Sequence, residues 1–306
     1  MKHLFILLTV SLTFAFAFQM NAQTIVSTEP MNRTIVLESF TAVNNYNVSY
    51  INNIIEELRK KHTDQFIVIN IHDGEDAIPK SGQPDFRTQY GTRIADLLDG
   101  HAPRGSFNRE RSPNIDDPSG STGIAVRSTY WELSAAEVAA EISPVNIAVR
   151  SEWIDRETIE IKIEAYFTDN CEPGCLLNVA LIENGVVGYQ EGPVDNPNFV
   201  HNNILRDLVT GQWGEDIKMN AKGDFYEKTF AYKPGEKFSI YDRNYDIVAF
   251  ITKPSRTHIY SGASTDVVIP FETTMELKGK PAMAFLEDQA VEGEIILTNN
   301  FDKDVS

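Results

Sequence analysis

The hydrophobic pattern of the first half of the chain alternates between strand-like and helix-like stretches. Residues 34–40 form a short apolar run, and residues 66–71 are apolar almost without interruption, as in a strand buried on both faces. Between them, apolar residues at i, i+3, i+4 and i+7 spacing predict a helix over residues 47–61. This order predicts a mixed α/β layer with a parallel strand pair.

Two further helices are predicted in the same half. Phe86, Tyr90, Ile94, Leu97 and Leu98 mark one amphipathic helix. A capping box over residues 134–137 predicts the start of another, which runs to about residue 142.

After Pro144 the period of the pattern becomes two. Every second residue from Ile159 to Phe167 is apolar, and five more short apolar runs follow up to Phe271, with turns rich in Gly, Pro and Asn between them. This pattern predicts an antiparallel β-sandwich. Residues 188–222 are predicted to form a long irregular loop, and such loops often carry function.

The start of the chain has the features of a secretory signal peptide. A short basic start precedes an apolar run from Leu4 to about Phe18, and Ala22 is a small residue suited to cleavage. The alternative is a retained membrane anchor, but the run is shorter than the ~20 residues that a span needs. We therefore expect export, and no membrane span in the mature chain.

These patterns divide the chain into five parts. They are a signal peptide (1–22), a linker (23–32), an α/β domain (33–143), a β-sandwich domain (144–272) and a C-terminal tail (273–306) with a candidate edge strand.

Composition excludes several classes of protein. The 306 residues include 27 Lys and Arg against 44 Asp and Glu, a net charge of −17, which disfavours nucleic-acid binding through a broad basic face. The 42% of hydrophobic residues is too high for a disordered chain. Two cysteines are too few for a disulfide-dense scaffold or a four-cysteine zinc site.

The two cysteines, Cys171 and Cys175, flank a turn in the second half. Because an exported chain meets an oxidising compartment, we expect a disulfide between them, with free thiols as the alternative. Redox activity is less favoured, since no helix N-terminus or basic neighbour is evident to lower a thiol pKa.

Other candidate chemistry is sparse. Residues 72–76 (His-Asp-Gly-Glu-Asp) follow the second predicted strand and are read as a solvated acidic loop, with a metal site as the alternative. His201 is expected to order the long loop by hydrogen bonding. The chain has no nucleophile elbow, zinc-protease motif or phosphate loop, so we expect neither enzyme activity nor a cofactor or metal.

Several motifs resemble one known family. In the first half they are residues 34–41 (Thr-Ile-Val-Leu-Glu-Ser-Phe-Thr) and residues 102–109 (Ala-Pro-Arg-Gly-Ser-Phe-Asn-Arg). In the second half they are residues 179–190, 201–206, 211–215 and 241–250. Over about residues 34–271 the chain resembles the outer membrane protein 28-related proteins of Gram-negative bacteria. That resemblance implies a thioredoxin-like first domain and a β-rich second domain.

The chain departs from the family pattern at the redox turn. Asn45 and Val48 stand where the family usually has two cysteines. Pro103 sits where thioredoxin-like folds carry a cis proline; the alternative is an ordinary trans turn proline, because only about 5–6% of X–Pro bonds are cis. Without a thiol at the turn there is no nucleophile for disulfide exchange. The thioredoxin-like domain is therefore expected to be redox-inactive.

These observations favour an exported, non-catalytic binding module. We expect it to lie in the periplasm, on the outer membrane or at the cell surface, and to bind a protein, peptide or glycan. Candidate binding residues in the long loop are His201, Asn202, Arg206 and Trp213. The alternative is an envelope thiol–disulfide oxidoreductase that uses Cys171 and Cys175. An open groove near Asn45 and Pro103 would accommodate an extended peptide, unless the long loop covers it.

Overall fold

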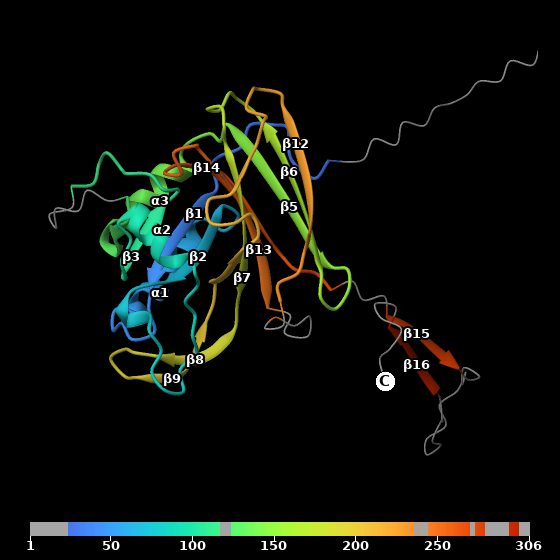
Figure 1. The fold of residues 1–306 in the computed structure, drawn as a ribbon, viewed down its shortest axis with the longest axis horizontal. Helices are drawn as coiled ribbons and strands as arrows, with labels where there is room; N and C mark the ends of the chain where they lie inside the picture. Colours follow the sequence, from blue (N-terminus) through green and yellow to red (C-terminus); the bar gives the residue numbers. More distant parts are fainter. Residues whose placement is uncertain are drawn as a thin grey trace, which may run out of the picture.

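The described residues of the computed structural model are 24–116, 124–235, 238, 244–269, 273–278 and 294–299. The predicted signal peptide and most of the tail lie outside them. The fold is mostly β, with three α-helices in the described part of the first half (Figure 1). The helices are α1 (Val48–Lys61), α2 (Gly91–Leu98) and α3 (Trp131–Ala139), and short 3-10 helices span Glu75–Ala77 and Ser128–Tyr130.

The strands are distributed over both halves of the described chain. In the first half they are β1 (Ile35–Thr41), β2 (Phe66–His72), β3 (Arg104–Phe107) and β4 (Val126–Arg127). In the second half they are β5 (Val145–Trp153), β6 (Ile159–Phe167), β7 (Leu176–Glu183), β8 (Val186–Gln190), β9 (Asn196–His201), β10 (Ile204–Leu208), β11 (Glu215–Asp216), β12 (Phe225–Tyr232), β13 (Tyr245–Thr252) and β14 (Ile259–Asp266). In the tail, β15 (Thr273–Lys278) and β16 (Glu294–Asn299) pair with each other.

The first half contains the predicted parallel strand pair. β1 and β2 run parallel, and β3 pairs antiparallel with the other edge of β1. One face of these strands packs on α1 and α3 and the other packs on α2, which explains why both strands are apolar on both faces.

α2 begins later in the sequence than the apolar pattern predicts, and α3 begins earlier. Phe86 lies outside α2 and packs instead against Val43 and Ile204. α3 begins at Trp131 and not at the capping box, because the buried Trp131 indole donates a hydrogen bond to the Val126 carbonyl (3.1 Å) at the helix start. Ser134 lies inside this helix. In both cases a tertiary contact overrides the local signal.

The second half contains two sheets packed face to face, as predicted. The three-stranded sheet β12-β6-β5 covers β7, β13 and β14, and their facing side chains form one core. Trp153 lies in this core, whereas Trp131 lies in the core of the first half, and both are buried.

One sheet crosses the predicted boundary at residues 143–144. Its strand order is β14-β13-β7-β10-β2-β1-β3-β4. The link is β10, which pairs with β7 on one side and meets β2 on the other through Ile204 and Asn70. The stretch 188–222 was predicted to be irregular, and that prediction is wrong, since it contributes β9, β10, β11 and part of β8.

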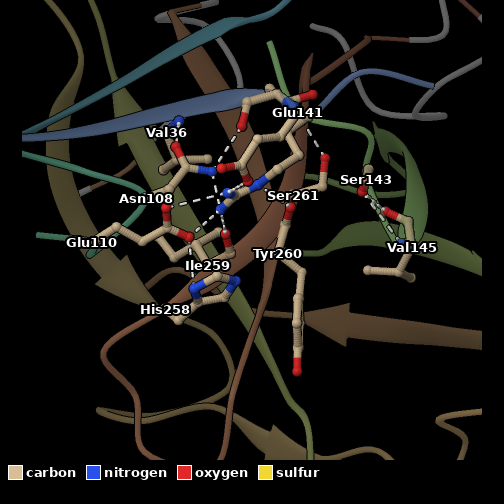
Figure 2. A network of polar contacts seen from close by, with 12 residues as sticks. Val36, Asn108, Glu110, Glu141, Ser143, Val145, His258, Ile259, Tyr260 and Ser261 are labelled. Atoms are coloured by element: carbon tan, nitrogen blue, oxygen red, sulfur yellow. Dashed lines mark hydrogen bonds and ion pairs between the residues drawn. The ribbon is translucent and has the colours of Figure 1, made fainter. Parts of the chain in front are cut away.

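The same sheet curls until β14 returns to the start of β1. Ile259 donates its N–H to the Asn108 carbonyl (2.7 Å), and the Asn108 side chain reaches Thr34 and Ile259 carbonyls. Arg33, 2% exposed, donates to the Ile259 and Tyr260 carbonyls and to the Glu110 carboxylate. Figure 2 labels these three partners together with Asn108. The two halves are therefore joined by a buried polar junction as well as by β10.

The segment predicted to be a linker is anchored to the sandwich where the structure describes it. Glu164 in β6, 1% exposed, accepts the backbone N–H groups of Ile25 (2.6 Å) and Val26 (3.1 Å). Asn146 in β5 donates to the carbonyls of Ser27 and Glu29. These bonds hold residues 25–29 against the three-stranded sheet.

Candidate functional site

The redox turn of the resemblance lies between β1 and α1 and holds no thiol. Asn45 donates a hydrogen bond to the Asp76 carboxylate (3.0 Å) and accepts one from the backbone N–H of Asn47 (3.1 Å). Val48 is the first residue of α1 and is buried. The two positions that replace cysteines therefore shape the turn and the start of the helix.

The β8–β9 hairpin covers this turn. The Gln190 amide donates to the carbonyls of Ala42 and Asn45 (both 3.2 Å), and Glu191 donates its N–H to the Val43 carbonyl (2.9 Å). The turn is thus closed off by residues of the predicted long loop, and it does not present an open groove to an extended peptide.

A pocket of about 210 Å³ lies beside the turn, at the carboxyl end of β1 and β2. Phe66 and Val68 face α1 from β2, and because strand side chains alternate, Asn70 and His72 continue the same face. A face that is apolar at one end of the strand therefore becomes polar at the other, and there it forms the pocket floor with Thr41. The walls come from α1 and from β9 with the residues that follow it: Val48, Asn52, Ile55, Glu56, Phe199, Val200, His201, Asn202 and Asn203.

Two of the residues that line this floor each carry a buried polar atom without a hydrogen-bond partner in the structure. The atoms are Oδ1 of Asn70 and Nδ1 of His72. The orientation of the Asn70 amide is fixed, because its Nδ2 group donates to the Asn202 carbonyl (2.7 Å) and a carbonyl can only accept. Buried polar groups are nearly always paired in folded proteins, so two such atoms in one pocket indicate a place for a polar ligand or ordered water.

The two histidines at the pocket are neutral. Burial, and then the neighbouring His201 and Arg206, lower the pKa of His72 from 6.5 to about 3. Burial lowers the pKa of His201 to about 4, against the opposing effect of its hydrogen bond with the Tyr189 carbonyl. The Phe86 ring contacts both imidazoles, with centroid distances of 4.9 and 4.7 Å.

We expect the imidazole of His72 to stay neutral in the folded protein from pH 7 down to pH 5, as followed by NMR titration. The unfolded chain takes up this proton near pH 6.5 and the folded chain only near pH 3, so stability is lost as the pH falls through that window. Between pH 6.5 and 5 the loss is about 2 kcal/mol. In urea titrations at pH 7 and pH 5, a His72→Gln variant should lose less stability than the unsubstituted protein. A His72 resonance that titrates near pH 6.5 would contradict this.

The structure brings only part of the predicted binding loop to the pocket. His201 and Asn202 line it. Arg206 instead pairs with Glu183 and lies 5.2 Å from the centroid of the Phe86 ring, while Trp213 packs under the Arg256 guanidinium (5.0 Å). Sequence reasoning missed Asn52, Asn70, Phe199 and Asn203. For Asn70 a signal existed, because a polar residue interrupts an otherwise apolar strand.

Two carboxylates of the stretch considered for a metal site, Asp73 and Asp76, have other partners. Asp73 accepts a hydrogen bond from Thr92 (2.7 Å) and lies 3.6 Å from His101, and Asp76 binds Asn45. Within the described ranges, no three His, Cys, Asp or Glu side chains gather in an arrangement that could hold a metal ion.

Cys171 and Cys175 are free thiols in the structure, so the predicted disulfide is not present in it. Both are buried in the core of the sandwich half, and the Cys175 thiol donates to the Glu172 carbonyl (3.0 Å). A hydrogen bond to Cys175 and burial together raise the pKa of the Cys171 thiol. A buried thiol with a raised pKa is a poor nucleophile for disulfide exchange. The same hydrogen bond lowers the pKa of the Cys175 thiol, but that thiol is fully buried in the core.

The Ala102–Pro103 peptide bond, just before β3, is cis. It therefore has the isomer that thioredoxin-like folds carry at this place.

Among the described residues, none of the helices has the length and apolar content that crossing a membrane requires.

One family model matches the chain. The family model for outer membrane protein Omp28 matches residues 102–265, more than half of the chain. A comparison with curated proteins finds no match.

Among solved structures, HBP35 of Porphyromonas gingivalis superposes with a TM-score of 0.56 and 16% sequence identity, over 88% of this chain and 85% of that one. A domain of the outer membrane lipoprotein Omp28 from the same organism is 23% identical, over 42% of this chain and 90% of that one, with a TM-score of 0.30. At these identities the first likeness concerns the fold alone, and the second superposition is too loose to support an argument.

Proposed function

The chain belongs to the family of outer membrane protein Omp28 and is an exported, outer-membrane-associated protein; from this premise we propose that it is a non-catalytic binding module. Its ligand site is the pocket between α1 and β9. The observation that carries this proposal is the pair of unpartnered buried atoms, Asn70 Oδ1 and His72 Nδ1, at the pocket floor. A ligand that pairs with them gains hydrogen bonds without first displacing a protein partner.

The scaffold of this site is a thioredoxin-like domain that has lost its redox chemistry. Two features support this part of the proposal: the β1–α1–β2 parallel unit and the antiparallel β3 on the other edge of β1. A thioredoxin-type site needs a thiol at the start of α1, where the helix N-terminus stabilises thiolate. This chain has Asn45 and Val48 there, and the β8–β9 hairpin covers the turn.

The test compares two tryptophan variants on α1. Asn52 lines the pocket, whereas its neighbour Asn53 is exposed and does not. Asn52→Trp fills the pocket, and Asn53→Trp is the matched control for the same substitution on the same helix.

Three probe classes are titrated into ¹⁵N-labelled protein: neutral monosaccharides, alkylamines and small carboxylates. We expect at least one class to shift the amide resonances of Asn70 and His201 in the unsubstituted protein and in Asn53→Trp, but not in Asn52→Trp. Absence of shifts with all three classes would overturn the proposal. So would robust insulin reduction that is lost in a Cys171→Ser variant, since it would show thiol–disulfide exchange.

A further inference from the structure

We propose that the pocket between α1 and β9 binds one sugar residue, a neutral ring rich in hydroxyl groups, through Asn70, His72 and Asn52. This inference rests on the proposed binding function and narrows the class of ligand. Its first support is the polarity of the lining, which is almost entirely uncharged: Thr41, Asn52, Asn70, His72, Asn202 and Asn203.

The two unpartnered floor atoms match a hydroxyl better than any other common group. Asn70 Oδ1 can only accept, so the ligand must present a donor there. His72 Nδ1 donates in one neutral tautomer and accepts in the other. A pair of adjacent sugar hydroxyls satisfies both atoms in either tautomer, because each hydroxyl is a donor and an acceptor.

Charge at the pocket disfavours ionic ligands. The one charged lining residue is Glu56, whose side chain is 61% exposed at the rim and 3.7 Å from Arg59. An anion would meet an acceptor oxygen at the floor and a carboxylate at the rim, and Arg206, the cation whose charge acts on His72, is already paired with Glu183. A cation would lose water without a buried carboxylate to replace it, and that desolvation is costly.

The rest of the pocket suits the apolar faces of a sugar ring. Phe199, Val48 and Ile55 supply carbon surface beside the polar floor. The Phe199 ring is held edge-on to His201, with 4.8 Å between their centroids. A cavity of about 210 Å³ has the volume of roughly seven water molecules, which is the size of a single hexose and not of an oligosaccharide.

The experiment titrates glucose, galactose, mannose and N-acetylglucosamine into the ¹⁵N-labelled full chain, with butylamine and acetate as probes of the other two classes. We expect at least one sugar to give saturable shifts at Asn70, His72 and Asn202. Affinity should fall at least tenfold in Asn70→Leu and in Asn52→Trp and stay within twofold of the original in Asn53→Trp. If Asn70→Leu fails to fold, the Asn52 and Asn53 pair still decides the outcome.

The outcomes separate this inference from the proposed function. Saturable shifts with butylamine or acetate and with none of the sugars would overturn the sugar assignment and leave the binding function standing. No shifts with any probe would overturn both. When a sugar binds, its methyl glycoside distinguishes the source: retained affinity indicates the end of a glycan, and lost affinity indicates a free sugar with an open anomeric hydroxyl.

Discussion

Replacing Arg109 by methionine is expected to lower the free energy of unfolding by about 3–5 kcal/mol. The Arg109 guanidinium makes two hydrogen bonds to the Glu38 carboxylate, at 2.7 and 2.6 Å, and the side chains are 3% and 2% exposed. It also lies 5.3 Å from the centroid of the Phe250 ring, so it joins β1 to β13. Without it, the Glu38 carboxylate is left buried and without its counter-charge. Urea unfolding followed by circular dichroism measures the loss.

A matched control tests whether the loss of stability comes from the burial of the ion pair or from ion pairing alone. Arg87 makes a similar two-point contact with Asp85, but the side chains are 41% and 49% exposed. Arg87→Met should therefore cost only about 0–1 kcal/mol. The double variant Glu38→Leu with Arg109→Met should be more stable than Arg109→Met alone, because it removes the buried Glu38 carboxylate that would otherwise lack a counter-charge. Equal losses in Arg87→Met and Arg109→Met would contradict this account.

The buried Glu38–Arg109 pair also explains two motifs of the sequence. Glu38 belongs to the run 34–41, and Asn108 and Arg109 end the run 102–109. The sequence marks both runs as resembling one family but gives no role to these polar residues. In the structure they are buried partners that fix β1 against β3 and β14.

Local periodicity predicted much of the secondary structure. The helix predicted over residues 47–61 is α1 (Val48–Lys61), and the strand predicted over residues 66–71 is β2. These elements carry their own signal, because their apolar faces are continuous in sequence. The strands within residues 188–222 lack that signal. β9 has a mainly exposed pattern, so it shows no apolar alternation even though it forms a hairpin with β8, the strand just before it in the sequence.

The sequence singled out two histidines of the candidate site but not the pocket that they share. His72 and His201 both attract attention in the sequence, yet they are more than a hundred positions apart. Their rings lie 6.3 Å apart because β10, directly after His201, meets β2 at Asn70. A pairing made through a single residue, Ile204, leaves no pattern in either strand that would reveal it.

The same sheet leads to a second expected result, which concerns independent folding of the two predicted domains. A fragment of residues 24–143 is expected not to fold, although this boundary is where the sequence changes period. Five residues of β1 and β2 face a core to which the second half contributes: Val36, Phe40, Ile67, Ile69 and Ile71. Their partners from the second half include Ile182, Val248, Phe250 and Ile259.

Burying one such side chain fully contributes about 1.5–3 kcal/mol. Since α2 still covers part of that face in the fragment, only part of the burial is lost. Even half of it for five residues is about 4–8 kcal/mol, which is comparable to the whole stability of a typical domain, about 5–15 kcal/mol. The fragment also leaves Arg33 without the Ile259 and Tyr260 carbonyls, which accept its hydrogen bonds at 2.5 and 3.0 Å.

A chain of residues 24–272 is the matched control, because it removes β15 and β16, which pair with each other, and keeps every strand of the shared sheet. We expect dispersed ¹H–¹⁵N spectra and one cooperative urea transition for this chain, and collapsed spectra for residues 24–143. A folded 24–143 fragment would mean that the first half folds independently and that β10 and β14 pack against a domain that is already folded. The expected failure would mean instead that the buried junction around Arg33 and Asn108 is part of one folding unit, so that the pocket floor on β2 depends on strands from the far end of the chain.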